Sequence, residues 1–223
     1  MQEIQLEVPG KPAVARLALP PGGSGPGVLL LHAWWGLKPF FRTLSERLAQ
    51  QGYVVLAPDL NDGAVAQTVA EAEALMKGRD FARSAATVRA AFDALRAHPA
   101  CRGAQVGVVG FSMGGGWALE TAAAAPQQVA AVVLYYGNGQ ADYARIRARV
   151  LGHFSPTDEW EPYEFVQATE QALRAAGSEV TFHLYPGVRH WFVEEDRPEY
   201  DPAAAGLAWE RTVAFLKESL PPA

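Results

Sequence analysis

Short apolar runs alternate with helical patterns along most of this chain, and this alternation constrains the fold more than any other feature. Runs of aliphatic and β-branched residues separated by helices are typical of parallel strands that are joined by crossover helices and buried on both faces. The pattern therefore predicts an α/β fold with a mostly parallel sheet flanked by helices on both faces. The expected strands cover residues 28–31, 53–57, 106–109, 129–135, 150–154 and 180–185.

The first 27 residues have a different pattern. Ile4–Val8 and Val14–Leu19 alternate apolar with polar or small residues around Pro9-Gly10, which predicts an antiparallel hairpin at the sheet edge. The stretch Pro20–Gly27 has low complexity, and we interpret it as a loop. A chain of 223 residues that is about half apolar suffices for one large core, so we expect a single domain over residues 1–223. Helices are expected near residues 40–51, in two stretches between 64 and 97, and at 113–125, 162–176 and 203–220.

Composition narrows the possible partners. The formal net charge is -5 and the cationic residues are scattered, so we expect neither nucleic acid nor membrane as a partner. Met1–Pro20 carries charged residues among its apolar ones and does not resemble a signal peptide, so a cytoplasmic location is expected. The one cysteine, Cys101, excludes an intramolecular disulfide and is expected in a loop between a helix and a strand. No cofactor or metal is expected, and the oligomeric state is left open.

The segment Gly110-Phe111-Ser112-Met113-Gly114 has the form G-x-S-x-G. An apolar run precedes it and a helix rich in small residues follows, so strand, sharp turn and helix are all present. Glycines suit such a turn because a Cβ at either position would collide with the neighbouring strand or helix. A glycine-rich turn without chemistry is the plain alternative, but the context predicts that Ser112 is a nucleophile.

A serine hydroxyl needs a histidine base and a carboxylate that orients the histidine. In open α/β sheets, reacting groups gather at the carboxyl ends of the strands. His98 lies at a helix end, and His153 and His183 lie within expected strands, so these three are poor candidates. His190 follows the last expected strand and a Pro-Gly turn, and it is the predicted base. His32 also follows a strand and remains the alternative base.

Asp158 is the predicted acid because it follows the strand that immediately precedes the histidine's strand along the chain. Neighbouring parallel strands end at the same edge of the sheet, which would bring this loop close to the base. Glu159 and Asp142 remain the alternative acids. The resulting order along the chain, Ser112, then Asp158, then His190, is that of α/β-hydrolases.

Acyl transfer also needs donors for the oxyanion, and backbone N–H groups usually supply them. We expect one from Met113, which follows the nucleophile, and the second from Trp34, with Ala33 as the alternative. Several aromatic and imidazole side chains follow the expected strand ends, which favours an apolar substrate cleft there. The predicted pocket residues are His32, Trp35, Tyr136, Trp160, Trp191 and Phe192, with the side chain of Trp34 beside them.

At this level of detail the chain resembles the dienelactone hydrolase family within the α/β-hydrolase fold, over nearly its whole length. The resemblance implies an eight-stranded, mostly parallel sheet, and it assigns nucleophile, acid and base to Ser112, Asp158 and His190. The segments that carry it are LLHAWWGL at 30–37, YVVLAPDL at 53–60, GVVGFSMGG at 107–115, YYG at 135–137 and HLYPGVRHWF at 183–192.

Two departures from the family pattern bear on substrate. Dienelactone hydrolases proper have a cysteine at the elbow and a glutamate after the third strand, where this chain has Ser112 and Ala33. They also bring arginines to the substrate carboxylate, one of them shortly after the catalytic histidine, where this chain has Glu194-Glu195-Asp196. An acidic run would repel an anionic ligand, so we expect dienelactone activity to be lost unless Arg189 or Arg197 compensates. The plain interpretation of the run is a solvated loop.

The leading hypothesis is therefore a serine hydrolase that cleaves a small, neutral carboxylic ester through an acyl-enzyme on Ser112, with His190 activating the water. Acyl-thioesters and lactones are alternative substrates, because the same groups serve all three. A hypothesis of another class is a noncatalytic α/β-hydrolase homologue that binds a small ligand. Peptidase activity is a weaker option, since no lid or propeller domain is evident.

Overall fold

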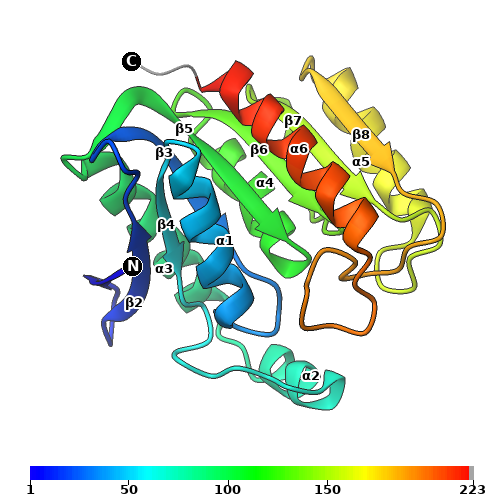
Figure 1. Ribbon diagram of the computed structural model, residues 1–223, viewed down its shortest axis with the longest axis horizontal. Coiled ribbons are helices and arrows are strands. Elements are labelled where there is room, and N and C mark those ends of the chain that lie inside the picture. The colour runs from blue at the N-terminus through cyan, green and yellow to red at the C-terminus, as the bar shows by residue number, and fades with distance from the viewer. Residues whose placement is uncertain (221–223) are drawn as a thin grey trace. The chain divides into compact units, whose positions relative to one another are not determined.

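The computed structural model describes residues 1–220, which contain eight strands, six α-helices and one short 3-10 helix (Figure 1). The elements follow the predicted alternation from residue 25 onward. Their bounds are β1 (Gln2–Leu6), β2 (Ala13–Ala18), β3 (Gly25–Leu31), α1 (Pro39–Gln50), β4 (Val54–Pro58), α2 (Val69–Lys77), α3 (Phe81–Ala97), β5 (Cys101–Phe111), α4 (Met113–Ala124), β6 (Val129–Tyr135), η1 (Tyr143–Arg145), β7 (Arg149–Phe154), α5 (Tyr163–Ala175), β8 (Val180–Leu184) and α6 (Pro202–Ser219).

The strands form one sheet in the order β1-β2-β4-β3-β5-β6-β7-β8. β1 pairs antiparallel with β2, and β2 with β4, which confirms the predicted hairpin at the sheet edge. The pairs β3–β4, β6–β7 and β7–β8 are parallel. The predicted α/β fold with a mostly parallel sheet is therefore confirmed.

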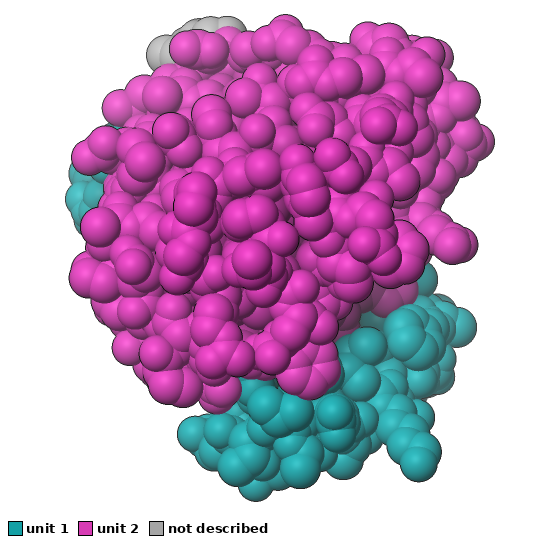
Figure 2. Space-filling model, turned by 90° about the vertical axis from the view of Figure 1, so that its right-hand side faces the viewer, with its two compact units in different colours: residues 1–106, 222–223 teal, residues 107–221 magenta. Residues whose placement is uncertain are grey.

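The described residues separate into two compact units, 1–106 and 107–220, which Figure 2 shows in teal and magenta. The boundary falls within β5. The expectation of a single domain stays a prediction, and each unit is described by itself below.

In the first unit, β3 and β4 are buried along their whole length, as expected for strands covered on both faces. Helices α1 and α3 both pack on β4, and Figure 1 shows α1 in front of this strand and α3 behind it. Helix α2 begins with a capping box, in which Thr68 and Glu71 each accept a hydrogen bond from the other's backbone N–H.

In the second unit, β6 is almost entirely buried, with α4 and α6 packed on it. Helix α4 is rich in alanine and glycine, and most of its residues are buried. These small residues allow close backbone contact: a Cβ on Gly115 would lie 2.6 Å from the carbonyl oxygen of Gly137, in the loop after β6. The N-terminus of α4, where Ser112 lies, is thereby held against the end of β6.

Two strands begin earlier than the apolar pattern predicts. β3 begins at Gly25, so the end of the proposed Pro20–Gly27 loop belongs to the sheet, and Gly25 N–H donates to the carbonyl of Ala100 at 3.0 Å. β5 begins at Cys101, so the prediction that Cys101 lies in a loop is wrong. The residues that precede the predicted starts are Gly-Pro-Gly in β3 and Cys-Arg-Gly-Ala-Gln in β5, and neither segment has the apolar pattern of a strand.

No helix among residues 1–220 has the combination of length and hydropathy that crossing a bilayer requires.

Candidate active site

Ser112 lies in a strained turn between β5 and α4. Its φ is 48° and its ψ is -116°, a conformation that non-glycine residues rarely adopt. The turn is tight, because a Cβ on Gly110 would overlap the carbonyl of Gly114, and a Cβ on Gly137 would overlap the carbonyl of Ser112. The backbone N–H of Ser112 donates to the carbonyl of Tyr135 at 2.9 Å. The predicted strand, turn and helix are all present, and the serine side chain makes no helix-capping bond.

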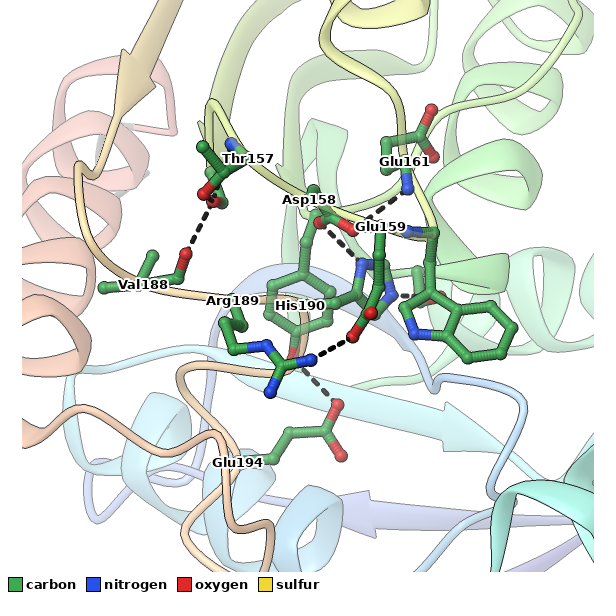
Figure 3. A network of polar contacts seen from close by, with 12 residues as sticks. Thr157, Asp158, Glu159, Glu161, Val188, Arg189, His190 and Glu194 are labelled. Carbon is green, nitrogen blue, oxygen red and sulfur yellow. Dashed lines mark hydrogen bonds and ion pairs between the residues drawn. The ribbon is translucent and has the colours of Figure 1, made fainter.

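The hydroxyl of Ser112 belongs to a chain of three hydrogen-bonded side chains. His190 Nε2 lies 3.0 Å from Ser112 Oγ, and His190 Nδ1 lies 2.7 Å from Asp158 Oδ2. The side chains of His190 and Asp158 are only 3% and 2% exposed. The structure thus brings together the three residues that the sequence singled out, and Figure 3 labels Asp158 and His190 of this group.

Hydrogen bonds to the second carboxylate oxygen of Asp158 help to define which atoms donate and which accept between Ser112, His190 and Asp158. Asp158 Oδ1 accepts from the backbone N–H groups of Trp160 at 2.8 Å and Glu161 at 3.0 Å. These two bonds hold the carboxylate in place, and the oxygens of a carboxylate accept hydrogen bonds. The proton on His190 Nδ1 therefore points to Asp158, and the lone pair on Nε2 faces the hydroxyl of Ser112.

Two further contacts join the loop of the acid to the loop of the base. Ser155 Oγ donates to the carbonyl of Val188 at 2.7 Å, and Arg189 pairs with Glu159 at 2.6 Å between exposed side chains (Figure 3). Sequence reasoning did not single out Ser155. Its position directly after β7 is the one signal in the sequence, and it does not distinguish Ser155 from the neighbouring Thr157.

The alternative base, His32, is engaged within the first unit. Its Nδ1 lies 2.6 Å from the carbonyl of Ala33, and its Nε2 accepts from the N–H of Leu60 at 3.0 Å. Burial lowers the pKa of His32 to about 4, so the ring is neutral at pH 7. With both nitrogens bonded to the backbone, His32 has no nitrogen left for a serine hydroxyl. His153 and His183 lie in β7 and β8, as expected.

The alternative acids, Glu159 and Asp142, lie in surroundings that differ from those of Asp158. Glu159 pairs with Arg189 at the surface, and Asp142 precedes the short helix η1 without a side-chain capping bond. Asp158 is the carboxylate that bonds to the histidine.

Most of the predicted pocket residues are buried in the core, and the aromatic-lined cleft stays a prediction. The sequence pattern places these residues at strand ends but does not determine which way each ring points. Trp160 is the exception: it is 41% exposed and packs on Trp191 with ring centroids 5.5 Å apart. The buried residues, none more than 2% exposed, are His32, Trp35, Tyr136, Trp191 and Phe192.

Of the expected oxyanion donors, Met113 is the first residue of α4. Backbone N–H groups in the first turn of a helix have no partner within the helix, and the positive end of the helix dipole favours an anion there. Trp34 and Ala33 belong to the first unit, and the role of either as second donor stays a prediction.

Glu194 does not lie in a solvated loop, so that interpretation of the acidic run is wrong at its first residue. The side chain is fully buried and accepts a hydrogen bond of 2.8 Å from the hydroxyl of Tyr136. Burial and the nearby Glu194 carboxylate raise the pKa of Tyr136 well above its usual value, so this tyrosine is neutral. Glu195 and Asp196 are exposed.

Glu161 is a titratable group that sequence reasoning missed. Burial and the nearby Asp158 carboxylate raise the pKa of Glu161 to about 7, so it changes charge near neutral pH. Nothing in the sequence distinguishes it from Glu159, because the difference arises from burial. Among residues 1–220, no group of three or more histidine, cysteine, aspartate or glutamate side chains is arranged to hold a metal ion.

The mostly parallel sheet, the serine in a strained strand-to-helix turn and the order of its two partners along the chain define an α/β-hydrolase. The solved structure of P91, a dienelactone hydrolase-like promiscuous phosphotriesterase from metagenomic libraries, has the same fold. Its TM-score is 0.87, with 24% identity, over 98% of both chains.

Sequence comparison then gives the family. The pattern of the dienelactone hydrolase family matches residues 14–220, and the chain belongs to this family of hydrolases. Among curated relatives, "Protein usf" of Aquifex pyrophilus is 32% identical over 98% of this chain and 99% of that protein. The carboxymethylenebutenolidase of Rhodococcus opacus is 32% identical over 89% of this chain and 83% of that protein.

Proposed function

We propose that this protein is a serine hydrolase that cleaves a small, neutral carboxylic ester through an acyl-enzyme on Ser112. One observation carries the proposal: the chain of hydrogen bonds from Ser112 through His190 to Asp158, with distances of 3.0 Å and 2.7 Å. A nucleophile, a base and a group that orients the base are the parts that serine-based acyl transfer requires. Membership of a hydrolase family supports the same conclusion.

In the first half of the proposed reaction, Ser112 Oγ attacks the ester carbonyl while its proton passes to His190 Nε2. Asp158 accepts a hydrogen bond from the Nδ1–H group throughout, without taking its proton, and stabilises the imidazolium that forms. The N–H of Met113 donates to the oxyanion, and one such donor is typically worth about 3 kcal/mol in the barrier. The imidazolium then protonates the leaving alkoxide, which departs as an alcohol.

In the second half, a water molecule takes the place of the leaving group. His190 Nε2 accepts a proton from this water, and the resulting hydroxide attacks the acyl carbonyl. The second tetrahedral intermediate collapses as His190 returns the proton to Ser112 Oγ. The carboxylic acid product is released and the enzyme regains its starting state.

Charge near the nucleophile supports a neutral substrate. Asp158 and Glu161 lie on one loop beside His190, and Arg189, next to the histidine, is paired with Glu159. Lactones are the second candidate substrate, because the family is one of dienelactone hydrolases. The burial of Glu194 also leaves Glu195 and Asp196 as the exposed carboxylates of the acidic run. The expected loss of dienelactone activity remains a proposal.

A fluorophosphonate probe tests the proposal directly. We expect the probe to label Ser112 in the wild-type protein, and we expect Ser112→Ala to abolish both labelling and turnover of p-nitrophenyl acetate. Wild-type protein that folds but neither reacts with the probe nor cleaves the ester would instead support a noncatalytic, ligand-binding homologue. A panel of acyl esters, acyl thioesters and lactones then ranks the substrate classes by kcat/KM.

A further inference from the structure

A buried tyrosine and a buried glutamate lie beside the imidazole of His190. The ring of Tyr136 packs against the His190 ring with centroids 4.9 Å apart, and its hydroxyl donates to Glu194 Oε1 at 2.8 Å. Both side chains are 0% exposed. Figure 3 shows Glu194 below His190. Tyr136 thus touches the candidate base, and neither residue of the pair takes part in the proposed proton transfers.

Tyr136 is fixed by the same backbone that fixes the nucleophile. It directly follows β6, where its N–H donates to the carbonyl of His153 in β7 at 2.8 Å, and its φ is 37°. The residue before it accepts the N–H of Ser112, and the residue after it, Gly137, lies against the carbonyl of Ser112. The position of the Tyr136 ring is therefore tied to the position of the serine.

Glu194 is fixed within the loop that carries the base. Its N–H donates to the carbonyl of Trp191 at 2.9 Å, and its carbonyl accepts the N–H of Arg197 at 2.9 Å. Trp191, next to His190, has a φ of 64°, so the turn that presents the imidazole is itself strained. The hydrogen bond between Tyr136 and Glu194 consequently joins the backbone behind the nucleophile to the loop of the base.

Burying a carboxylate is costly, and the cost is offset only where hydrogen bonds or charges compensate it. An apolar pair of similar volume would fill the same space without this cost. A buried tyrosine–carboxylate bond also has a defined direction and length, which apolar packing lacks. Placing such a bond beside the base favours a role in geometry over a role in stability.

We propose that the Tyr136–Glu194 pair is a positioning device that holds His190 within hydrogen-bonding distance of Ser112. This inference rests on the proposed function, in which His190 is the base. Misplacing a catalytic group by about 1 Å can cost on the order of 100-fold in rate. Since neither residue of the pair has an exposed surface for substrate, its loss lowers kcat and leaves KM nearly unchanged.

The test compares two neighbouring tyrosines. Tyr136→Phe removes the hydroxyl that bonds to Glu194 and keeps the ring against His190. Tyr135→Phe removes an equally buried hydroxyl, whose partner is Thr212 Oγ1 of α6 at 2.6 Å. With p-nitrophenyl acetate, we expect kcat to fall about 10- to 100-fold in Tyr136→Phe, with KM within about twofold of wild type. In Tyr135→Phe we expect kcat to stay within about threefold.

Substitutions of the glutamate test the same bond from its other end. Glu194→Gln keeps an acceptor oxygen for Tyr136, so kcat is expected to stay within about fivefold of wild type. Glu194→Leu removes the acceptor, and its kcat should fall as far as that of Tyr136→Phe. If Tyr136→Phe does not fold, as judged by circular dichroism, the two glutamate variants make the comparison alone.

Equal kcat values in Tyr136→Phe and Tyr135→Phe would overturn the positioning role, as would equal losses in Glu194→Gln and Glu194→Leu. These outcomes are distinct from a failure of the proposed function. In that case the wild-type protein itself would neither react with the fluorophosphonate probe nor cleave the ester.

Discussion

His190 and His153 are both buried histidines of the second unit, and both ring nitrogens of each are hydrogen-bonded. His190 lies between Asp158 and Ser112, whereas His153 lies between the hydroxyls of Tyr185 at 2.9 Å and Thr212 at 3.0 Å. Their exposed fractions are 2% and 0%. Burial and hydrogen bonding are therefore similar at the two sites, and the chemical identity of the partners differs.

The comparison shows what makes one histidine suited to act as a base. Burial, followed by the nearby His183 and Arg211, lowers the pKa of His153 well below its usual value, and the partners of its two ring nitrogens are hydroxyls. His190 has a buried carboxylate on one side, and its Nδ1 lies 2.7 Å from Asp158 Oδ2. His190 also lies on a loop at the carboxyl end of the sheet, whereas His153 lies inside strand β7. We infer that the carboxylate and the strand-end position together distinguish the catalytic site from the structural one.

The largest expected difference between the two histidines is kinetic. Replacing His190 with alanine should lower kcat by about 10⁶-fold. Ser112, His190 and Asp158 act together in the proposed mechanism, so loss of the base disables all three. Replacing His153 with alanine should change kcat less than about tenfold and lower the free energy of unfolding by about 2–4 kcal/mol. Steady-state kinetics and urea unfolding of both variants check this. Comparable kinetic losses would remove the distinction.

The next largest effect is expected from the carboxylate that bonds to His190. Asp158→Asn should lower kcat by about 10⁴-fold, because an amide permits the wrong tautomer of His190. Asp142→Asn, at a carboxylate that follows the preceding strand, is the matched control and should leave kcat unchanged. The measurement is ester turnover by both variants at equal concentrations of folded protein. An equal loss in the two variants would refute the choice of acid.

The low pKa of His153 predicts a pH dependence of stability. The folded protein keeps this ring neutral, whereas the unfolded chain binds a proton near pH 6.5, so the contribution is complete above that pH and is lost on acidification. Between pH 7 and pH 5 the wild type should therefore lose more unfolding free energy than His153→Gln. Urea titrations at both pH values measure the difference. Parallel losses would show that His153 is not the titrating group.

The smallest expected effect comes from removing either of two buried hydroxyls, one near each histidine. Ser155 bonds to the carbonyl of Val188, two residues before His190, whereas Thr212 bonds to His153. Ser155→Ala should lower kcat about tenfold by loosening the loop of the base, an effect of about 1.4 kcal/mol. Thr212→Val should lower the free energy of unfolding by about 1–3 kcal/mol and leave kcat unchanged. The reverse pattern would contradict the division between the two regions.

Much of the fold could be predicted because strand and helix patterns are local. The apolar runs and the G-x-S-x-G turn gave the parallel sheet and the position of Ser112, and strand order then placed Asp158 and His190 at the same edge. What could not be predicted depends on residues distant in sequence. The buried Glu194 accepts a hydrogen bond from Tyr136, which lies 58 residues earlier, and the raised pKa of Glu161 arises first from its burial in the folded chain. A local sequence pattern does not indicate which residues become neighbours in the folded protein.

Trp160 combines two roles that lie on different atoms. Its backbone N–H donates to Asp158, while its side chain is exposed and packs on Trp191. Replacing the indole leaves the main-chain donor in place, so position 160 can accept many side chains without disturbing the proposed acid. Saturation mutagenesis at this position therefore varies the exposed surface beside Trp191 while the main-chain hydrogen bond to Asp158 is kept.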